Sequence, residues 1–196
     1  MKMHNLSLRR FGALTLLALI AATASPPVAR SHAFAPVQRR EHLTEQETDL
    51  VRDTQELDRR VALFAKIAER RVAAVTGAAA AQPPSAKDLE KWGELPKGTR
   101  AQLFGDLARI LDEAINNIDD VAARSPNSSL VPKAVRRLAE TSARILPQLA
   151  SLRTDAAAEN EREALEQVID NLEQVLDAAK KLPADTSEKK GEKKKN

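Results

Sequence analysis

Apolar side chains recur mostly at steps of three, four or seven residues along four long stretches of this chain, and proline or glycine separates the first three stretches from one another. This spacing puts the apolar residues on one face of an α-helix, whereas a half-buried strand would place them at every second position. The four apolar faces are formed by Leu50, Leu57, Val61, Phe64, Ala68, Val72 and Val75; by Leu103, Leu107, Ile110, Ala114, Ile118 and Val121; by Val131, Val135, Leu138, Ile145, Leu149 and Leu152; and by Ala158, Leu165, Ile169, Leu172, Leu176 and Ala179. A helix with a single apolar face is unstable in isolation, so the pattern predicts an all-α fold, an antiparallel up-down four-helix bundle.

The first of these stretches predicts one long helix. Thr44 and Glu47 have the spacing of a capping box, in which each side chain accepts a hydrogen bond from the backbone N–H of the other residue. The helix would end at Gly77 and reach about 50 Å at 1.5 Å per residue, so one end could protrude beyond its partners. Residues 77–98 form a proline-containing connector, in which we expect a short helix over residues 85–92.

Three further helices follow the connector. The second is predicted from Thr99, which opens another capping box, to Ser125, which precedes a proline. The third covers about residues 129–153, and Pro147 must kink or interrupt it because proline has no backbone N–H. The fourth covers about residues 155–182. The third helix is mostly basic and the fourth mostly acidic, so we expect these two to be neighbours.

The N-terminus has the order of a secretory signal. Three basic residues precede an uncharged apolar stretch over residues 11–24, and small residues and prolines follow it. That stretch is shorter than the roughly 20 residues that span a bilayer, which favours cleavage over an uncleaved membrane anchor. We expect cleavage after Ala24, with Ala33 as a later alternative, and a periplasmic or secreted location. The general secretory route is favoured because the pair before Phe11 departs from the twin-arginine spacing.

The predicted domain plan therefore has four parts. A signal peptide covers residues 1–24, a flexible lead-in covers 25–40, the helical bundle covers 41–182, and a disordered lysine-rich tail covers 183–196. Removal of the signal takes away three positive charges and no negative charge, so the formal net charge falls from +3 to zero. Net charge then gives no attraction to nucleic acid, although the lysines of the tail could make weak contact with an anionic envelope surface.

The residue inventory offers few groups for catalysis or metal binding. The chain has no cysteine, its methionines are Met1 and Met3, and its histidines are His4, His32 and His42. These residues cannot provide the axial ligands of a haem, the histidine ligands of a di-iron site or a thiol nucleophile. We therefore predict no catalytic, cofactor-binding or metal-binding residues, no cofactor, no haem and no enzymatic activity.

The acidic clusters are interpreted as solvated helix faces. These acidic groups could bind a hard cation, but no Asp/Asn-Gly loop of ligand spacing accompanies them. The arginine doublets could bind phosphate, but acidic residues are interleaved nearby and nucleic-acid motifs with stacking aromatics are missing. The groups concerned are Asp112-Glu113, Asp119-Asp120, Glu159-Glu161-Glu163, Arg59-Arg60, Arg70-Arg71 and Arg136-Arg137. His42 is interpreted as a solvated residue before a helix cap. Trp92 is expected to cover one end of the bundle, with an exposed contact residue as the alternative.

Residues 43–47 read Leu-Thr-Glu-Gln-Glu and resemble the LTxxQ motif of small exported helical stress proteins, which include a periplasmic chaperone and a sensor-kinase inhibitor. Here the glutamine occupies the fourth position and Glu47 the fifth. The leading hypothesis is a non-enzymatic exported protein that acts through contacts with an unidentified protein partner or an envelope surface. The resemblance implies the alternative, a periplasmic stress chaperone or sensor-type protein.

Overall fold

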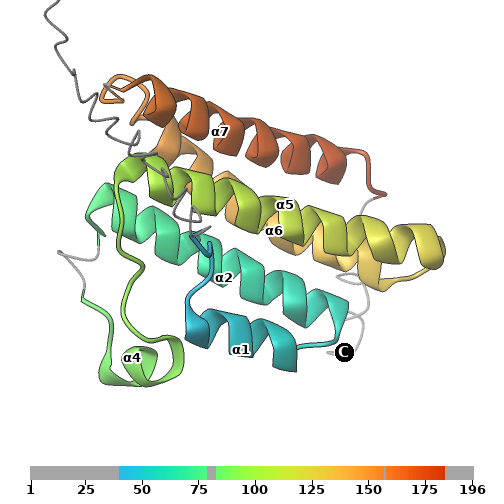
Figure 1. The fold of residues 1–196 in the computed structure, drawn as a ribbon. Helices are drawn as coiled ribbons and strands as arrows, with labels where there is room; N and C mark the ends of the chain where they lie inside the picture. Colours follow the sequence, from blue (N-terminus) through green and yellow to red (C-terminus); the bar gives the residue numbers. More distant parts are fainter. Residues whose placement is uncertain (1–39, 79–82, 157, 184–196) are drawn as a thin grey trace, which may run out of the picture. The chain divides into compact units, whose positions relative to one another are not determined.

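A computed structural model describes residues 40–78, 83–156 and 158–183 of the chain (Figure 1). Within these ranges the regular structure is helical throughout, which confirms the all-α prediction for this part of the chain. The helices are α1 (Glu45–Asp53), α2 (Leu57–Thr76), α4 (Ala86–Trp92), α5 (Arg100–Arg124), α6 (Leu130–Ala150) and α7 (Glu159–Lys180). The predicted signal peptide, all but the last residue of the lead-in and all but the first residue of the tail lie outside the described residues.

Four long helices share one apolar core. Helix α2 packs against α5 and α6, and α7 packs against the same two helices from the opposite side, so that α5 and α6 lie between α2 and α7 (Figure 1). The largest fully buried apolar side chains come from all four helices: Phe64, Ile67, Phe104, Leu107, Ile110, Leu111, Leu138, Leu149, Leu165, Ile169 and Leu172. Each of these helices thus buries its apolar face against two or three others, which is what makes each of them stable.

The chain reverses direction from each long helix to the next, but adjacent helices are not all antiparallel. Helices α5 and α7 run side by side in the same direction, because Arg100 pairs with Glu161 near both N-termini and Asn171 donates to the carbonyl of Ala108 further along. Helices α2 and α6 also run parallel (Figure 1). The consecutive helices α5 and α6 make far fewer contacts with each other than with α2 and α7.

The prediction of one long first helix is wrong. The chain leaves helical geometry at Thr54, whose backbone is extended with φ −100° and ψ 102°, and α2 begins three residues later. The Thr54 side chain donates to the carbonyl of Leu50 at 2.8 Å and so satisfies one of the last acceptors of α1. The break lets α1 fold back alongside α2 (Figure 1), so the first helix does not protrude as a 50 Å rod.

The other helix ends lie close to their predicted positions. Thr44 and Thr99 form capping boxes, α4 occupies the predicted short helix, and Gly77 ends α2 in the left-handed conformation with φ 71°. Pro147 lies inside α6 and does not end it; the helix continues to Ala150. Turns occupy most of the stretch after Ala150, so α6 is shorter and α7 starts later than predicted.

Candidate functional site

A buried carboxylate joins α1 to α2. Glu47 is fully buried and accepts hydrogen bonds from Arg71 Nη1 at 2.9 Å, Arg71 Nη2 at 2.7 Å and Arg70 Nε at 3.1 Å. It also accepts from the backbone N–H of Thr44 at 3.0 Å, as the capping box requires. The same Arg71 Nη2 donates to the carbonyl of His42 at 2.5 Å. Bidentate contacts between ions are among the strongest hydrogen bonds in proteins, and these fix α1 and the residues before it onto α2.

Arg70 also contacts the end of α4 and holds this helix in place. Its Nη2 atom donates to the carbonyls of Trp92 at 3.0 Å, Gly93 at 3.3 Å and Glu94 at 2.7 Å, just where α4 ends. Its guanidinium also lies 5.7 Å from the centre of the Trp92 ring, within the range of a cation–π contact. The position of α4 therefore depends on one buried arginine of α2, whose remaining charge contact is with Glu47.

The pKa values of the two buried carboxylates in this region, Glu47 and Asp106, are shifted in opposite directions. Burial works to raise the pKa of Glu47, but the hydrogen bonds and charge of Arg71, together with Thr44 and Arg70, outweigh it and bring the pKa below its ordinary value. Burial raises the pKa of Asp106 on α5, although Arg40 lies 2.9 Å from its carboxylate and Arg71 lies 4.0 Å from it. The difference follows from hydrogen bonding, which is extensive at Glu47 and slight at Asp106.

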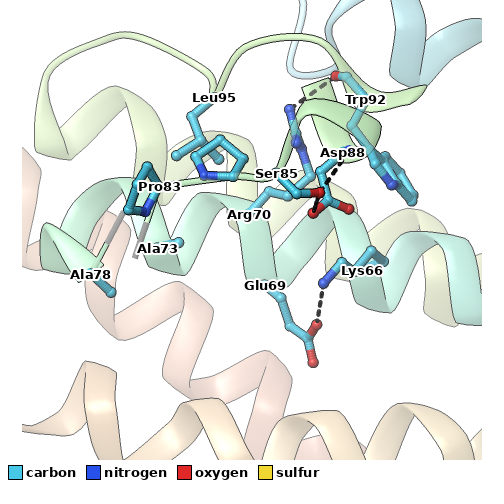
Figure 2. A pocket seen from close by; sticks show the side chains of 11 residues that line it. Lys66, Glu69, Arg70, Ala73, Ala78, Pro83, Ser85, Asp88, Trp92 and Leu95 are labelled. Carbon is cyan, nitrogen blue, oxygen red and sulfur yellow. Dashed lines mark hydrogen bonds and ion pairs between the residues drawn. The ribbon is translucent and has the colours of Figure 1, made fainter. Parts of the chain in front are cut away.

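An open hollow with a volume of about 510 Å³ lies between α2 and the segment that carries α4 (Figure 2). Its wall on the α2 side includes Lys66, Glu69 and Ala73, and its opposite wall includes Pro83 and Leu95. The volume falls within the range of about 300–1,000 Å³ that is typical of ligand pockets. Figure 2 shows the side chains of Pro83 and Leu95 directed towards Ala73, which makes this end of the hollow apolar.

A second, more open hollow continues from the first, and its surface is mostly apolar, with Glu94 and Lys97 among its lining residues. Both are lined by Ala73, Pro84 and Leu95, and the second adds Leu89 and Pro96. Leu89 is 42% exposed and is the one large hydrophobic side chain classed as exposed within the described ranges. We call these five residues the α4 surface. It combines Leu89 of α4 with the residues on either side of that helix and with Ala73 of α2.

The charged groups around the first hollow are engaged within the protein. Lys66 lies 3.5 Å from Glu69, which also pairs with Arg144 of α6 at 2.7 Å. Ser85 caps α4 and donates to Asp88 at 2.7 Å, and this hydrogen bond lowers the pKa of Asp88. These side chains serve as helix caps and ion pairs, so the hollow is better suited to binding by contact than to acid–base chemistry.

The burial of Arg70 and Arg71 is not predicted by the local sequence pattern. Both side chains are buried, because the break at Thr54 brings Glu47 back to them. His42 is likewise less exposed than predicted, since its Nε2 atom lies 2.7 Å from Glu113 of α5 and its side chain is 18% exposed. The capping box was visible in the sequence, but no local pattern shows that the capping carboxylate also meets two arginines more than twenty residues away.

Trp92 is 7% exposed and packs into the apolar core, so it is not an exposed contact residue. The acidic pairs have separate roles: Asp112 accepts from Asn171 of α7 at 2.8 Å, and Glu161 pairs with Arg100 at 3.0 Å. No group of three or more potential metal ligands gathers anywhere in residues 40–78, 83–156 and 158–183. Among the helices of these same ranges, none combines the length and apolar character needed to cross a membrane.

Residues 43–47, which resemble the LTxxQ motif, have local structural roles here. Thr44 and Glu47 form the capping box, and the side chain of Gln46 packs against Gly93 at the end of α4. These contacts explain three of the five residues by their local structural roles, without reference to a function shared with the stress proteins. Comparison of the chain with protein-family models, with curated proteins and with solved structures found no match.

Proposed function

We propose that the protein is a non-enzymatic, exported interaction protein with a helical-bundle core, and that it binds a short apolar segment of a partner protein on the α4 surface. The observation that carries this proposal is the exposure of Leu89 beside Ala73, Pro84, Leu95 and Pro96 in two continuous hollows. An apolar centre with charged residues around it is the usual anatomy of a protein-binding surface.

The attachment of α4 supports the same proposal. Helix α4 has only seven residues and, apart from its chain neighbours, packs mainly on α1 and the buried Arg70. An isolated helix of that length is unstable in water, so its shape depends on those contacts. A binding surface held in its bound geometry loses less conformational entropy on association, which favours affinity. The buried charges would thus act by keeping the α4 surface preformed.

The proposal is tested by replacing Leu89 with aspartate. A buried leucine contributes about 1.5–3 kcal/mol, so Leu89→Asp should weaken partner binding at least about tenfold. Gln148→Glu is the matched control, because it adds one negative charge at an exposed position on α6. The measurement is quantitative capture from envelope extract by the chain expressed at full length, followed by titration of the captured partner with each purified variant.

Equal binding by Leu89→Asp and the native chain would overturn the α4 surface as the binding site. Export is read in the same experiment from the intact mass of the recovered protein, which should correspond to cleavage after Ala24 or Ala33. An uncleaved chain recovered from the cytoplasmic fraction would contradict export. Chaperone activity has a different readout, the suppression of aggregation of several unrelated unfolded proteins, and its loss in Leu89→Asp would assign that activity to the same surface.

A further inference from the structure

A separate hollow of about 510 Å³ lies at the opposite end of α2 from the α4 surface. It lies where α1 turns into α2 and where α5 turns into α6, and its apolar lining comes from Leu57, Val121 and Leu130. Arg60 and Ala73 are thirteen residues apart on α2, which corresponds to about 20 Å along the helix. The two hollows are therefore distinct sites.

Two arginines line this hollow, and for one of them the described residues supply no ion pair and no acceptor for its buried Nε atom. Arg60 lines the hollow, its Nε atom is buried without a hydrogen-bond partner, and its side chain forms no ion pair with any residue in the described ranges. Arg124 lines the same hollow from the end of α5, with its Nε donating to the carbonyl of Asp120 at 3.0 Å. A buried donor without an acceptor is costly, and a bound acceptor would remove that cost.

The remaining polar groups of the hollow are compatible with an anion. The side-chain amides of Asn117 and Gln55 also line it; each donates one hydrogen to a backbone carbonyl, of Glu113 at 2.6 Å and of Arg52 at 2.7 Å, and its second hydrogen can donate to a ligand. Glu56 is the carboxylate of the lining, and its charge is balanced by Arg59 at 2.9 Å. Arginine forks match the geometry of carboxylates, while the lining of Leu57, Val121 and Leu130 would exclude water from an apolar body.

We propose that this hollow binds a small carboxylate with an apolar body, whose anionic head lies between Arg60 and Arg124. The same chemistry is presented by a free medium-chain acid and by the C-terminal carboxylate of a peptide that ends in an aliphatic residue. The site does not depend on the α4 surface, and it adds a small-molecule or chain-end specificity to the proposed protein contact.

The test uses the full chain and four probes: hexanoate, hexanamide, inorganic phosphate, and a short acetylated peptide with a free C-terminal leucine. Binding is followed by NMR through the Nε–Hε signals of the arginine side chains. We expect saturable binding of hexanoate or the peptide with a dissociation constant on the order of 1 mM, and a shift of the Arg60 signal. Whichever of these two probes binds more tightly identifies the natural source of the carboxylate.

Variants assign the binding to the two arginines. Arg60→Gln and Arg124→Gln should each weaken binding by roughly tenfold or more, because each removes one charged hydrogen-bond donor. Arg109→Gln is the matched control, since it removes the same charge from an exposed position of α5 outside the hollow. Arg124 is exposed and its replacement should leave the fold intact, which keeps the test decisive even if Arg60→Gln is unstable.

Three results would overturn the proposal. The first is absence of saturable binding by both carboxylate probes. The second is equal affinity for hexanamide, which would show that charge is not recognised, or for phosphate, which would show that the apolar lining contributes nothing. The third is unchanged binding by Arg124→Gln. None of these results bears on Leu89, so failure here is distinguishable from failure of the proposed protein contact.

Discussion

At the scale of single residues, the carboxylate of Glu47 fixes α1 to α2 through Arg70 and Arg71. It accepts four hydrogen bonds, from Thr44, Arg70 and twice from Arg71, and it is completely buried. Removal of one partner from a buried ion cluster leaves the opposite charge without compensation, which is usually far more harmful than the pair is beneficial. The arginines would then be the unpaired groups.

Glu47→Gln should therefore lower the free energy of unfolding by about 3–5 kcal/mol, measured by urea denaturation near pH 7. Glu45→Gln is the control, because it makes the same change in the same helical turn at an exposed position. The control should shift stability by no more than about 0.5 kcal/mol. Equal effects of the two substitutions would contradict the assigned role of Glu47.

The sign of the pH dependence follows from the same residue. The pKa of Glu47 is lower in the folded protein than its ordinary value of 4.5, so its charged form stabilises the fold. That contribution is fully present above about pH 4.5 and is lost as the pH falls through the folded pKa. The stability difference between the native chain and Glu47→Gln should therefore shrink below pH 4.5. Asp106 has the opposite sign, because its raised pKa means that its charged form costs stability above that pKa.

At the scale of the elements, α1 and α4 depend on contacts that a helical pattern does not reveal. The long helices and their capping boxes follow from apolar spacing and from Thr44 and Thr99, because those signals are local. The break at Thr54 is different. The stretch from Leu50 to Leu57 keeps helical spacing, but a bend there allows Glu47 to reach Arg70 and Arg71. That tertiary gain overrides a weak local preference.

Part of the candidate site can be predicted from local sequence signals, and part of it cannot. The connector prolines, the short helix and Trp92 were identifiable from the sequence, because proline and capping residues mark them. The exposure of Leu89 and the burial of Arg70 depend on how the segment lies on α2, and no spacing within the segment encodes that. Arg60 has the sequence context of an ordinary surface arginine, and only the packing of four segments around it shows the hollow.

A substitution at Gly93 tests whether the end of α4 is held in place there. The backbone of Gly93 has φ 66° and ψ −169°, a region that only glycine adopts readily, and an added Cβ would lie 3.0 Å from the Gln46 side chain. Gly93→Ala should destabilise the protein by about 1–3 kcal/mol and speed hydrogen exchange in α4. Gly77→Ala is the control, since Gly77 is left-handed at φ 71° with open space around it, and its effect should be smaller and confined to the end of α2. A larger effect at Gly77 would show that α4 is not held at Gly93.

At the scale of the whole molecule, the residues that the structure describes form a core of four helices, α2, α5, α6 and α7. Two short helices, α1 and α4, are attached to one side of α2. The core accounts for stability, and the α4 surface lies mainly on the segment that carries α4. The proposed partner binding uses this surface, and the buried charges keep the surface in shape.

Hydrogen–deuterium exchange of the full chain, with and without the captured partner, can locate the binding surface. Binding at the α4 surface should slow exchange at residues 73–78 and 86–97 and leave exchange in α7 unchanged, because α7 is remote from the α4 surface. Protection confined to α7, or to any part of the chain outside those two ranges, would contradict it.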